Sequence, residues 1–162
     1  MTPVLTGLAR RDARRAPMET LSSGVISIEA GLSGDFKGTK HPTRQITIMA
    51  EEDWQGALES LPVGGHDLPW TVRRANMLVR GLRLPRVKAA IIAVGQVKLE
   101  VTGQTYPCRR MDEAYPGLLK ALAKDWRGGV TCRVVEGGEI ALGDKVSLLS
   151  APPEPPLRVL PG

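Results

Sequence analysis

The chain has few aromatic residues, and this shortage narrows its class. Only one phenylalanine, two tyrosines and three tryptophans occur in 162 residues, so a hydrophobic core must be built mainly from Val, Leu, Ile and Ala. Proteins that bind single-stranded nucleic acid stack bases on aromatic side chains that lie beside basic ones. No basic run here is interleaved with aromatic residues. We therefore expect no nucleic-acid partner.

Long apolar runs and cysteine frameworks are also missing. No window approaches the roughly 18 consecutive apolar residues of a membrane span, and the N-terminus lacks the apolar core of a signal peptide. Two cysteines, Cys108 and Cys132, are too few for a disulfide framework, and no Cys/His grouping has zinc-finger spacing. We expect a cytoplasmic protein with no membrane association.

Glycine and proline are abundant and predict short elements separated by turns. There are eighteen glycines and thirteen prolines, a composition that favours a β-rich fold over a helical bundle. Alternating apolar residues predict strands, including a pair that turns at Gly95, and two segments predict helices. The predicted strands are 25–29, 44–49, a pair within 89–101, 130–135, 139–142 and 145–149, and the predicted helices are 51–60 and 115–124. We expect a mainly β (α+β) fold, a mixed β-barrel with a few short helices and a hairpin at 136–138.

Three segments differ in composition. Residues 1–23 carry an arginine cluster with little periodicity and are expected to form a solvated N-terminal arm. Residues 24–150 hold the predicted strands and form the domain, and residues 151–162 are a proline-rich tail. The net charge of +5 suits an anionic partner such as a small phosphorylated ligand. The alternative is a slightly basic surface without an anionic partner.

Cysteine chemistry is the first candidate for a site. Cys108 follows Pro107 and precedes Arg109 and Arg110 in the stretch 102–112, where positive charge would favour a thiolate. A buried, inert cysteine is the alternative. Cys132 lies in the middle of a predicted strand and is expected to be a packed small hydrophobe, although it could also be a resolving partner for Cys108.

An ordered set of short motifs resembles one family. The motifs are residues 31–35 (GLSGD), 44–45 (RQ), 74–76 (RAN), 107–108 (PC), 128–129 (GG), 133–134 (RV), 137–138 (GG) and 143–144 (GD). From about residue 24 to residue 149, the chain resembles a MOSC domain, which is named for the C-terminal part of molybdenum-cofactor sulfurases. The resemblance implies a β-barrel of MOSC type that binds the molybdenum cofactor (molybdopterin). The chain looks like a stand-alone bacterial member, so no pyridoxal-phosphate site is expected in it.

The resemblance also implies roles for particular residues. Cys108 matches the cysteine that handles sulfur or ligates molybdenum in relatives. Arginine forks suit phosphate and pterin oxygens, and a flanking lysine and an asparagine add donors. The cofactor-binding candidates are Arg44, Arg74, Asn76, Arg133 and Lys37. The alternatives are ion pairs or surface charges for the arginines, a solvated loop position for the lysine, and loop capping for the asparagine.

Three hypotheses about function follow. In the first, the chain binds the cofactor and carries sulfur on Cys108 as a persulfide, with a sulfurase as donor and a molybdoenzyme as acceptor. In the second, it is a small molybdenum-dependent reductase or detoxification protein for N-hydroxylated compounds, with electrons supplied by a partner. In the third, it is a non-catalytic binding module with a structural cysteine. An enzymatic activity is therefore left open.

Overall fold

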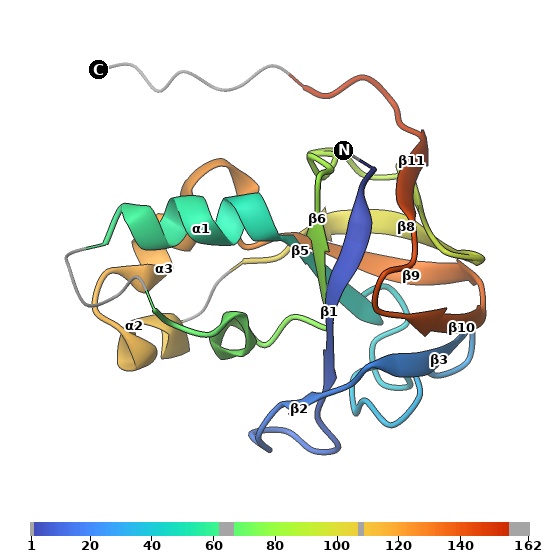
Figure 1. Cartoon of the computed structure of the whole chain (residues 1–162), viewed down its shortest axis with the longest axis horizontal. Helices are drawn as coiled ribbons and strands as arrows, with labels where there is room; N and C mark the ends of the chain where they lie inside the picture. Colours follow the sequence, from blue (N-terminus) through green and yellow to red (C-terminus); the bar gives the residue numbers. More distant parts are fainter. Residues whose placement is uncertain (1, 62–66, 107–108, 156–162) are drawn as a thin grey trace.

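The computed structural model (Figure 1) describes residues 2–61, 67–106 and 109–155, which form two β-sheets and a few short helices. The larger sheet holds, in spatial order, β11 (Val146–Ser150), β7 (Ile91–Val94), β8 (Val97–Gln104), β9 (Val130–Glu136), β5 (Ile46–Ala50), β6 (Met77–Arg80), β1 (Val4–Arg10) and β2 (Glu19–Thr20). The smaller sheet holds β10 (Gly138–Ala141), β3 (Ser23–Ser27) and β4 (Gly31–Leu32). The predicted mainly β architecture with short helices is confirmed.

The larger sheet is mixed and curls toward itself. Strands β5 and β6 are parallel, whereas the other pairs are antiparallel. Val4 of β1 forms an isolated bridge with Lys145, and Leu5 N donates to Asp144 O at 2.9 Å. These contacts bring one end of the sheet to the other, but within the described residues no continuous ladder joins β1 to β11. A closed barrel therefore stays a prediction.

The helices gather on one side of the strands (Figure 1). The α-helices are α1 (Glu51–Glu59), α2 (Arg110–Ala114) and α3 (Leu118–Ala123), and the short 3₁₀ helices are η1 (Trp70–Arg73) and η2 (Lys124–Trp126). The predicted helix 51–60 is confirmed as α1, whose first turn is acidic and therefore complements the helix dipole.

The predicted helix over 115–124 is confirmed as α3, but its start is not, because α3 begins at Leu118 and a separate helix, α2, ends at Ala114. Pro116 and Gly117 separate α2 from α3, and Gly117 takes a left-handed φ of 92°. Asp112 lies in α2, and its Oδ1 accepts a hydrogen bond from Leu119 N at 2.9 Å. This carboxylate therefore satisfies a backbone donor in the first turn of α3.

The expectation of a solvated N-terminal arm is wrong for residues 4–10, which form strand β1. Leu5, Leu8 and Ala9 are fully buried, and the strand pairs with β6. The pairing register shifts between Leu5 and Gly7. Leu5 and Leu8 are three positions apart in the sequence, and the irregularity lets both be buried. The strand therefore lacks the period-two pattern by which strands are recognised. The predicted boundaries at residues 24 and 150 stay predictions.

The predicted hairpin at 136–138 is also wrong. Strand β10 follows β9 directly in the chain, yet it pairs with β3, and β9 pairs with β8 and β5. The backbone of Gly137 approaches Ile26 O so closely that a Cβ at this position would lie 2.4 Å from that oxygen. The glycine allows the chain to leave the larger sheet for the smaller one, instead of folding back on β9.

Strand β5 is buried along its whole length and separates two hydrophobic clusters. Ile46 and Ile48 belong to the cluster within the curled sheet. Met49 belongs to the second cluster, which contains residues of α1, α2 and α3. Because side chains alternate along a strand, Thr47 points to the same side of β5 as Met49. The helical side of the sheet is therefore also the side that Thr47 faces.

Two glycines with the same positive φ provide a test of this packing. Gly129 and Gly143 both have φ of 96°, but a Cβ on Gly129 would lie 2.1 Å from Ile48 O, whereas none of the described atoms lies within 4 Å of a Cβ on Gly143. We expect Gly143→Ala to cost about 1 kcal/mol because of the left-handed conformation alone. Gly129→Ala should cost about 3 kcal/mol or more, because the backbone of β5 must also move.

Urea unfolding of both variants measures this difference. Equal losses in the free energy of unfolding would show that the close approach of residue 129 to β5 does not constrain the fold.

Candidate functional site

A cavity of about 240 Å³ lies on the helical side of β5. Its walls come from the turn after β1, the loop before β5, β5 itself, η1, the end of β8 and the start of α2. The lining residues are Arg11, Arg14, Lys37, Thr47, Arg73, Arg74, Thr105, Arg110 and Met111. Six of these nine residues carry a positive charge, and none of the nine is acidic. Such a concentration of one charge sign favours an anionic ligand.

Two segments far apart in the sequence form one wall of the cavity. Arg11 N donates to Asp35 Oδ1 at 3.1 Å, and Phe36 N donates to Arg11 O at 2.9 Å. The guanidinium of Arg11 also lies 4.9 Å from the centre of the Phe36 ring, a cation–π distance. These contacts fasten the arginine-rich turn after β1 to the loop that carries Lys37. The site is therefore built by a segment expected to be free in solution.

Lys37 has an unusual environment for a lysine. Its Nζ donates a hydrogen bond to Thr47 Oγ1 at 3.1 Å. Burial lowers the pKa of Lys37 from its usual 10.5 to about 8, and although Asp35 opposes this shift, neighbouring guanidinium groups add to it. Those groups belong to Arg11, Arg73 and Arg44. The lowered pKa therefore reflects mainly the loss of water around the ammonium group, and repulsion by the guanidinium groups adds to it.

Arg74 occupies a strained backbone position at the end of η1. Its φ of 64° and ψ of 28° lie in the left-handed region, which is uncommon for residues other than glycine. Its Nη1 is buried and has no hydrogen-bond partner among the described residues, and the same is true of Thr105 Oγ1. Both residues line the cavity. Since unpaired buried polar atoms are costly, these two atoms retain a capacity to bind a ligand.

A wider hollow of about 600 Å³ adjoins the cavity. Arg74, Arg110 and Met111 line both spaces, and the hollow adds apolar surface from Met18 and Val72. The site therefore combines a cationic cavity with a wider, partly apolar space. Its dimensions are those of pockets for small organic ligands, which measure roughly 300–1,000 Å³. The arrangement suits a molecule with a charged end and a less polar body.

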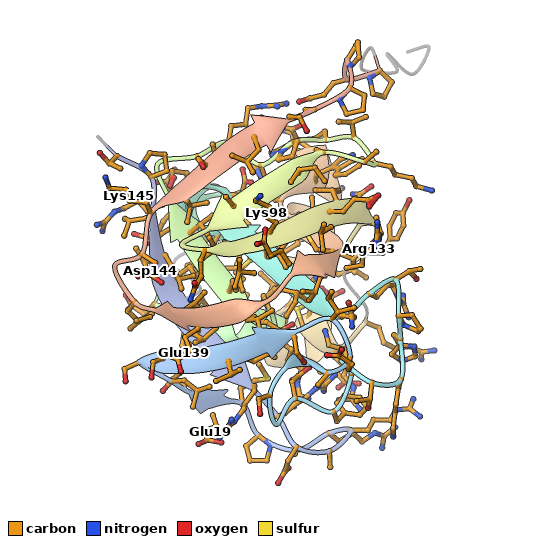
Figure 2. All side chains as sticks on the ribbon, turned by 90° about the vertical axis from the view of Figure 1, so that its right-hand side faces the viewer. Glu19, Lys98, Arg133, Glu139, Asp144 and Lys145 are labelled. Carbon is orange, nitrogen blue, oxygen red and sulfur yellow. The ribbon has the colours of Figure 1, made fainter. Side chains whose placement is uncertain are left out.

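Lys37 and Arg74 are the predicted site residues that line the cavity. Arg44 is exposed and does not line it, although its charge reaches Lys37. Arg133 also lies elsewhere: it is exposed on β9 and forms an ion pair with Glu100 of β8. In Figure 2, Arg133 and Lys98 both lie on the side of the molecule away from the helices. The alternative of a structural ion pair thus describes the contacts of Arg133.

Asn76 is fully buried and connects strands. Its Oδ1 accepts from Thr47 N at 2.9 Å, and its Nδ2 donates to Ala9 O at 3.2 Å. Its backbone bonds to the same two residues. In the structure, the side-chain amide of Asn76 is therefore bonded to the backbone and not directed to a ligand. Asn76 instead holds β1 and β5 in place beside the cavity.

The two cysteines lie in different parts of the chain. Cys108 and Pro107 lie outside the described residues, but Thr105 and Arg110, which flank them in the chain, both line the cavity. Cys132 is fully buried in the cluster within the curled sheet, and burial raises the pKa of its thiol. The prediction that Cys132 is a packed small hydrophobe is confirmed.

Several lining residues were not singled out from the sequence. Arg11 and Arg14 belong to the arginine cluster assigned to an arm, and Arg73 directly precedes a predicted site residue. Arg110 follows Cys108 by two residues, so the sequence predicts for it only an effect on the thiol. The number of arginines near motif positions is the sequence signal that points to these lining residues. The sequence pattern does not reveal that β1 pairs with the sheet, and this pairing brings Arg11 and Arg14 close to the other arginines.

The donor set fits an anionic, oxygen-rich group better than a bare metal ion. Guanidinium and ammonium groups donate hydrogen bonds and accept none, so they bind phosphate and carboxylate oxygens. No group of three or more His, Cys, Asp or Glu side chains that could hold a metal ion occurs within residues 2–61, 67–106 and 109–155. The cavity therefore fits the phosphate-bearing part of a cofactor such as molybdopterin.

The fold and the cavity define a mostly β protein with a cationic cavity, and comparison with known proteins identifies its family. The model of the MOSC domain matches residues 35–147, and the chain belongs to the MOSC domain family. No curated protein sequence matches the chain. In the part of the chain that the structure describes, no helix has the length and apolar character needed to cross a membrane.

Solved structures show the same fold at low sequence identity. The YuaD protein from Bacillus subtilis is 20% identical, with a TM-score of 0.72 over 90% of this chain and 94% of that one. The YiiM protein from Escherichia coli is 15% identical, with a TM-score of 0.69 over 91% of this chain and 70% of that one. The YiiM protein from Geobacillus stearothermophilus is 16% identical, with a TM-score of 0.56 over 92% and 74%.

The partly buried charge of Lys37 predicts that this residue lowers the stability of the protein. Below about pH 8 the amine is charged in both the folded and the unfolded state, so the folded state bears the full cost. Between about 8 and 10.5 the unfolded state binds more protons, and the cost fades as the pH rises. We expect Lys37→Met to raise the free energy of unfolding by about 2 kcal/mol at neutral pH.

Urea unfolding at neutral pH and at about pH 10 tests this, since the gain should shrink at the higher pH. Lys40→Met is the matched control, because Lys40 is exposed in the same loop. It should change stability by no more than about 0.5 kcal/mol. A loss of stability in Lys37→Met at neutral pH would contradict the proposed cost of burying this charge.

Proposed function

We propose that the chain binds the molybdenum cofactor, or a related anionic pterin, in the cationic cavity and handles sulfur through Cys108. The observation that carries this proposal is the set of six cationic side chains around one cavity in a member of the MOSC family. A net surplus of positive charge on the surface would not require such a gathering. Here the charges converge on one cavity despite their mutual repulsion.

Particular residues would hold the ligand. Arg74 and Arg110 line both spaces and are placed to bind phosphate oxygens, and Lys37 adds an ammonium group from the opposite loop. The apolar surface of Met18 and Val72 in the wider hollow would pack against a ring system. When bound, the cofactor would supply a molybdenum centre for redox or sulfur chemistry.

Cys108 would act as sulfur acceptor and carrier, or as a ligand of molybdenum. Thr105 and Arg110 lie on either side of it in the chain, within three residues, and both line the cavity. The positive charge of this region would favour the thiolate over the thiol. A sulfurase would be the donor of the sulfur, and a molybdoenzyme its acceptor. A reducing compartment such as the cytoplasm would keep the carrier thiol free of disulfides.

A molybdenum-dependent reductase for N-hydroxylated compounds is a second candidate. The hollow of about 600 Å³ beside the cationic cavity offers space for an organic substrate. This function needs a metal that stays bound and a partner that supplies electrons. Molybdenum analysis of protein isolated from its host separates the two candidates, because a stoichiometric metal content favours the reductase and its absence favours the carrier.

Ligand binding provides the first test of the proposal. Arg74→Gln and Arg110→Gln each remove a guanidinium from the cavity, and each should weaken binding of isolated molybdenum cofactor about tenfold or more, as expected for loss of a charge-assisted hydrogen bond. Arg133→Gln is the matched control, since it removes an arginine that pairs with Glu100 outside the cavity. Titration calorimetry measures all four proteins. Equal weakening by the Arg133 variant would refute the assignment of the site.

Sulfur transfer provides the second test. Incubation with a persulfide donor should add the mass of one sulfur atom to wild type, and Cys108→Ser should abolish the adduct because the accepting thiolate is gone. Cys132→Ala, which removes the buried thiol, should keep the adduct. Mass spectrometry of the intact protein and of its peptides locates the added sulfur. An adduct that persists in Cys108→Ser would exclude Cys108 as the carrier.

A further inference from the structure

Lys37 combines three features that bear on its reactivity. Its amine lines a cavity, it is held by a hydrogen bond to Thr47 Oγ1 at 3.1 Å, and it is surrounded by groups that bind anions. The charged groups that act on it are Asp35 in its own loop, one arginine from the turn after β1, one from η1 and one preceding β5. Those arginines are Arg11, Arg73 and Arg44.

We propose that Lys37 is a covalent binding site for small anionic aldehydes, which it captures as an imine while the neighbouring guanidinium groups hold the phosphate or carboxylate. This inference rests on the anion binding proposed above and adds a chemical reaction to it. The ligand class is a phosphorylated or carboxylated aldehyde small enough for a cavity of about 240 Å³.

The chemistry needs no cofactor and no oxidant. The lone pair of the neutral Lys37 Nζ attacks the carbonyl carbon, and a proton passes from nitrogen to oxygen to form a carbinolamine. The C–O bond then breaks, the oxygen leaves as water with the second proton of the amine, and a C=N bond remains. No atom changes its net oxidation state, and hydrolysis by one water molecule reverses the reaction.

The environment of Lys37 favours this reaction at moderate pH. Only the neutral amine is nucleophilic, and desolvation beside other cationic groups is a known way to activate a lysine. With its pKa lowered to about 8, a large fraction of Lys37 is neutral at that pH, whereas a lysine with the usual value of 10.5 is almost entirely protonated. Lys40 offers a comparison within the same loop, because its side chain is exposed and does not line the cavity.

The geometry also explains why the aldehyde should be anionic. Arg11, Arg14 and Arg110 line the same cavity as Lys37. A phosphate bound to these groups would hold its own aldehyde next to the amine and raise the effective concentration of the carbonyl. An uncharged aldehyde would lack this attachment and would react more slowly with Lys37 than a phosphorylated one.

Reductive trapping tests the proposal with two matched probes. Wild-type protein is incubated with glycolaldehyde phosphate and cyanoborohydride, which converts an imine to a stable secondary amine, and peptide mass spectrometry locates the modification. We expect modification at Lys37, at least tenfold faster than at Lys40 and at least tenfold faster than with unphosphorylated glycolaldehyde. The rate at Lys37 should rise as the pH increases through about 8.

Two variants separate the amine from its charge. Lys37→Arg keeps a cation in the cavity but lacks a nucleophilic amine, so it should still bind inorganic phosphate while showing no adduct at position 37. Lys40→Arg should react like wild type. Modification spread evenly over surface lysines, or equal rates with both probes, would overturn the covalent site.

The same measurements distinguish this inference from the function on which it depends. If wild type binds molybdenum cofactor and phosphate but Lys37 gives no adduct, the covalent site is refuted and the proposed function stands. If wild type binds neither anion, the cationic cavity is not a ligand site, and both proposals fail together.

Discussion

Electrostatic repulsion within one cavity is the constraint on which the rest of the site depends. Six positively charged side chains surround a space of about 240 Å³, and like charges at short range destabilise the folded state unless they are compensated. Burial is the largest cause of the lowered pKa of Lys37, and three neighbouring guanidinium groups lower it further. Sites that bind ligands commonly carry such a cost in stability. Charges placed to bind an anion repel one another when the anion is absent. A bound anion would relieve the repulsion.

Rigid contacts are needed to keep these charges together. Asp35 accepts a hydrogen bond from Arg11 N and places a buried carboxylate near Lys37. Asn76 binds the backbone of both Ala9 and Thr47, and it follows the strained Arg74 by two residues. Buried hydrogen bonds of this kind favour one arrangement of the chain. The fold therefore places its polar interior next to the cavity, where the charges would otherwise push the segments apart.

The position of the cavity follows from the double role of β5. One side of this strand packs into the curled sheet through Ile46 and Ile48, and the other side packs against the helices through Met49. Thr47 lies on the helical side and reaches the cavity, where it accepts the hydrogen bond from Lys37. A strand buried on both sides moves little, so a ligand site built against it gains a rigid floor. The arginines of η1 and α2 then face this floor from the helical layer.

The sequence by itself determined the local elements, the family and part of the site. Period-two patterns predicted most strands, acidic residues predicted the start of α1, and the ordered motifs led to the MOSC family and to Lys37 and Arg74. Tertiary structure decided which charges meet. Strand β1 escaped detection because its register shift breaks the alternation, so the proximity of Arg11 and Arg14 to Lys37 was hidden. Arg133 lies outside the cavity because the pairing of β8 with β9 places it beside Glu100. Both outcomes depend on contacts between distant segments, which local patterns do not encode.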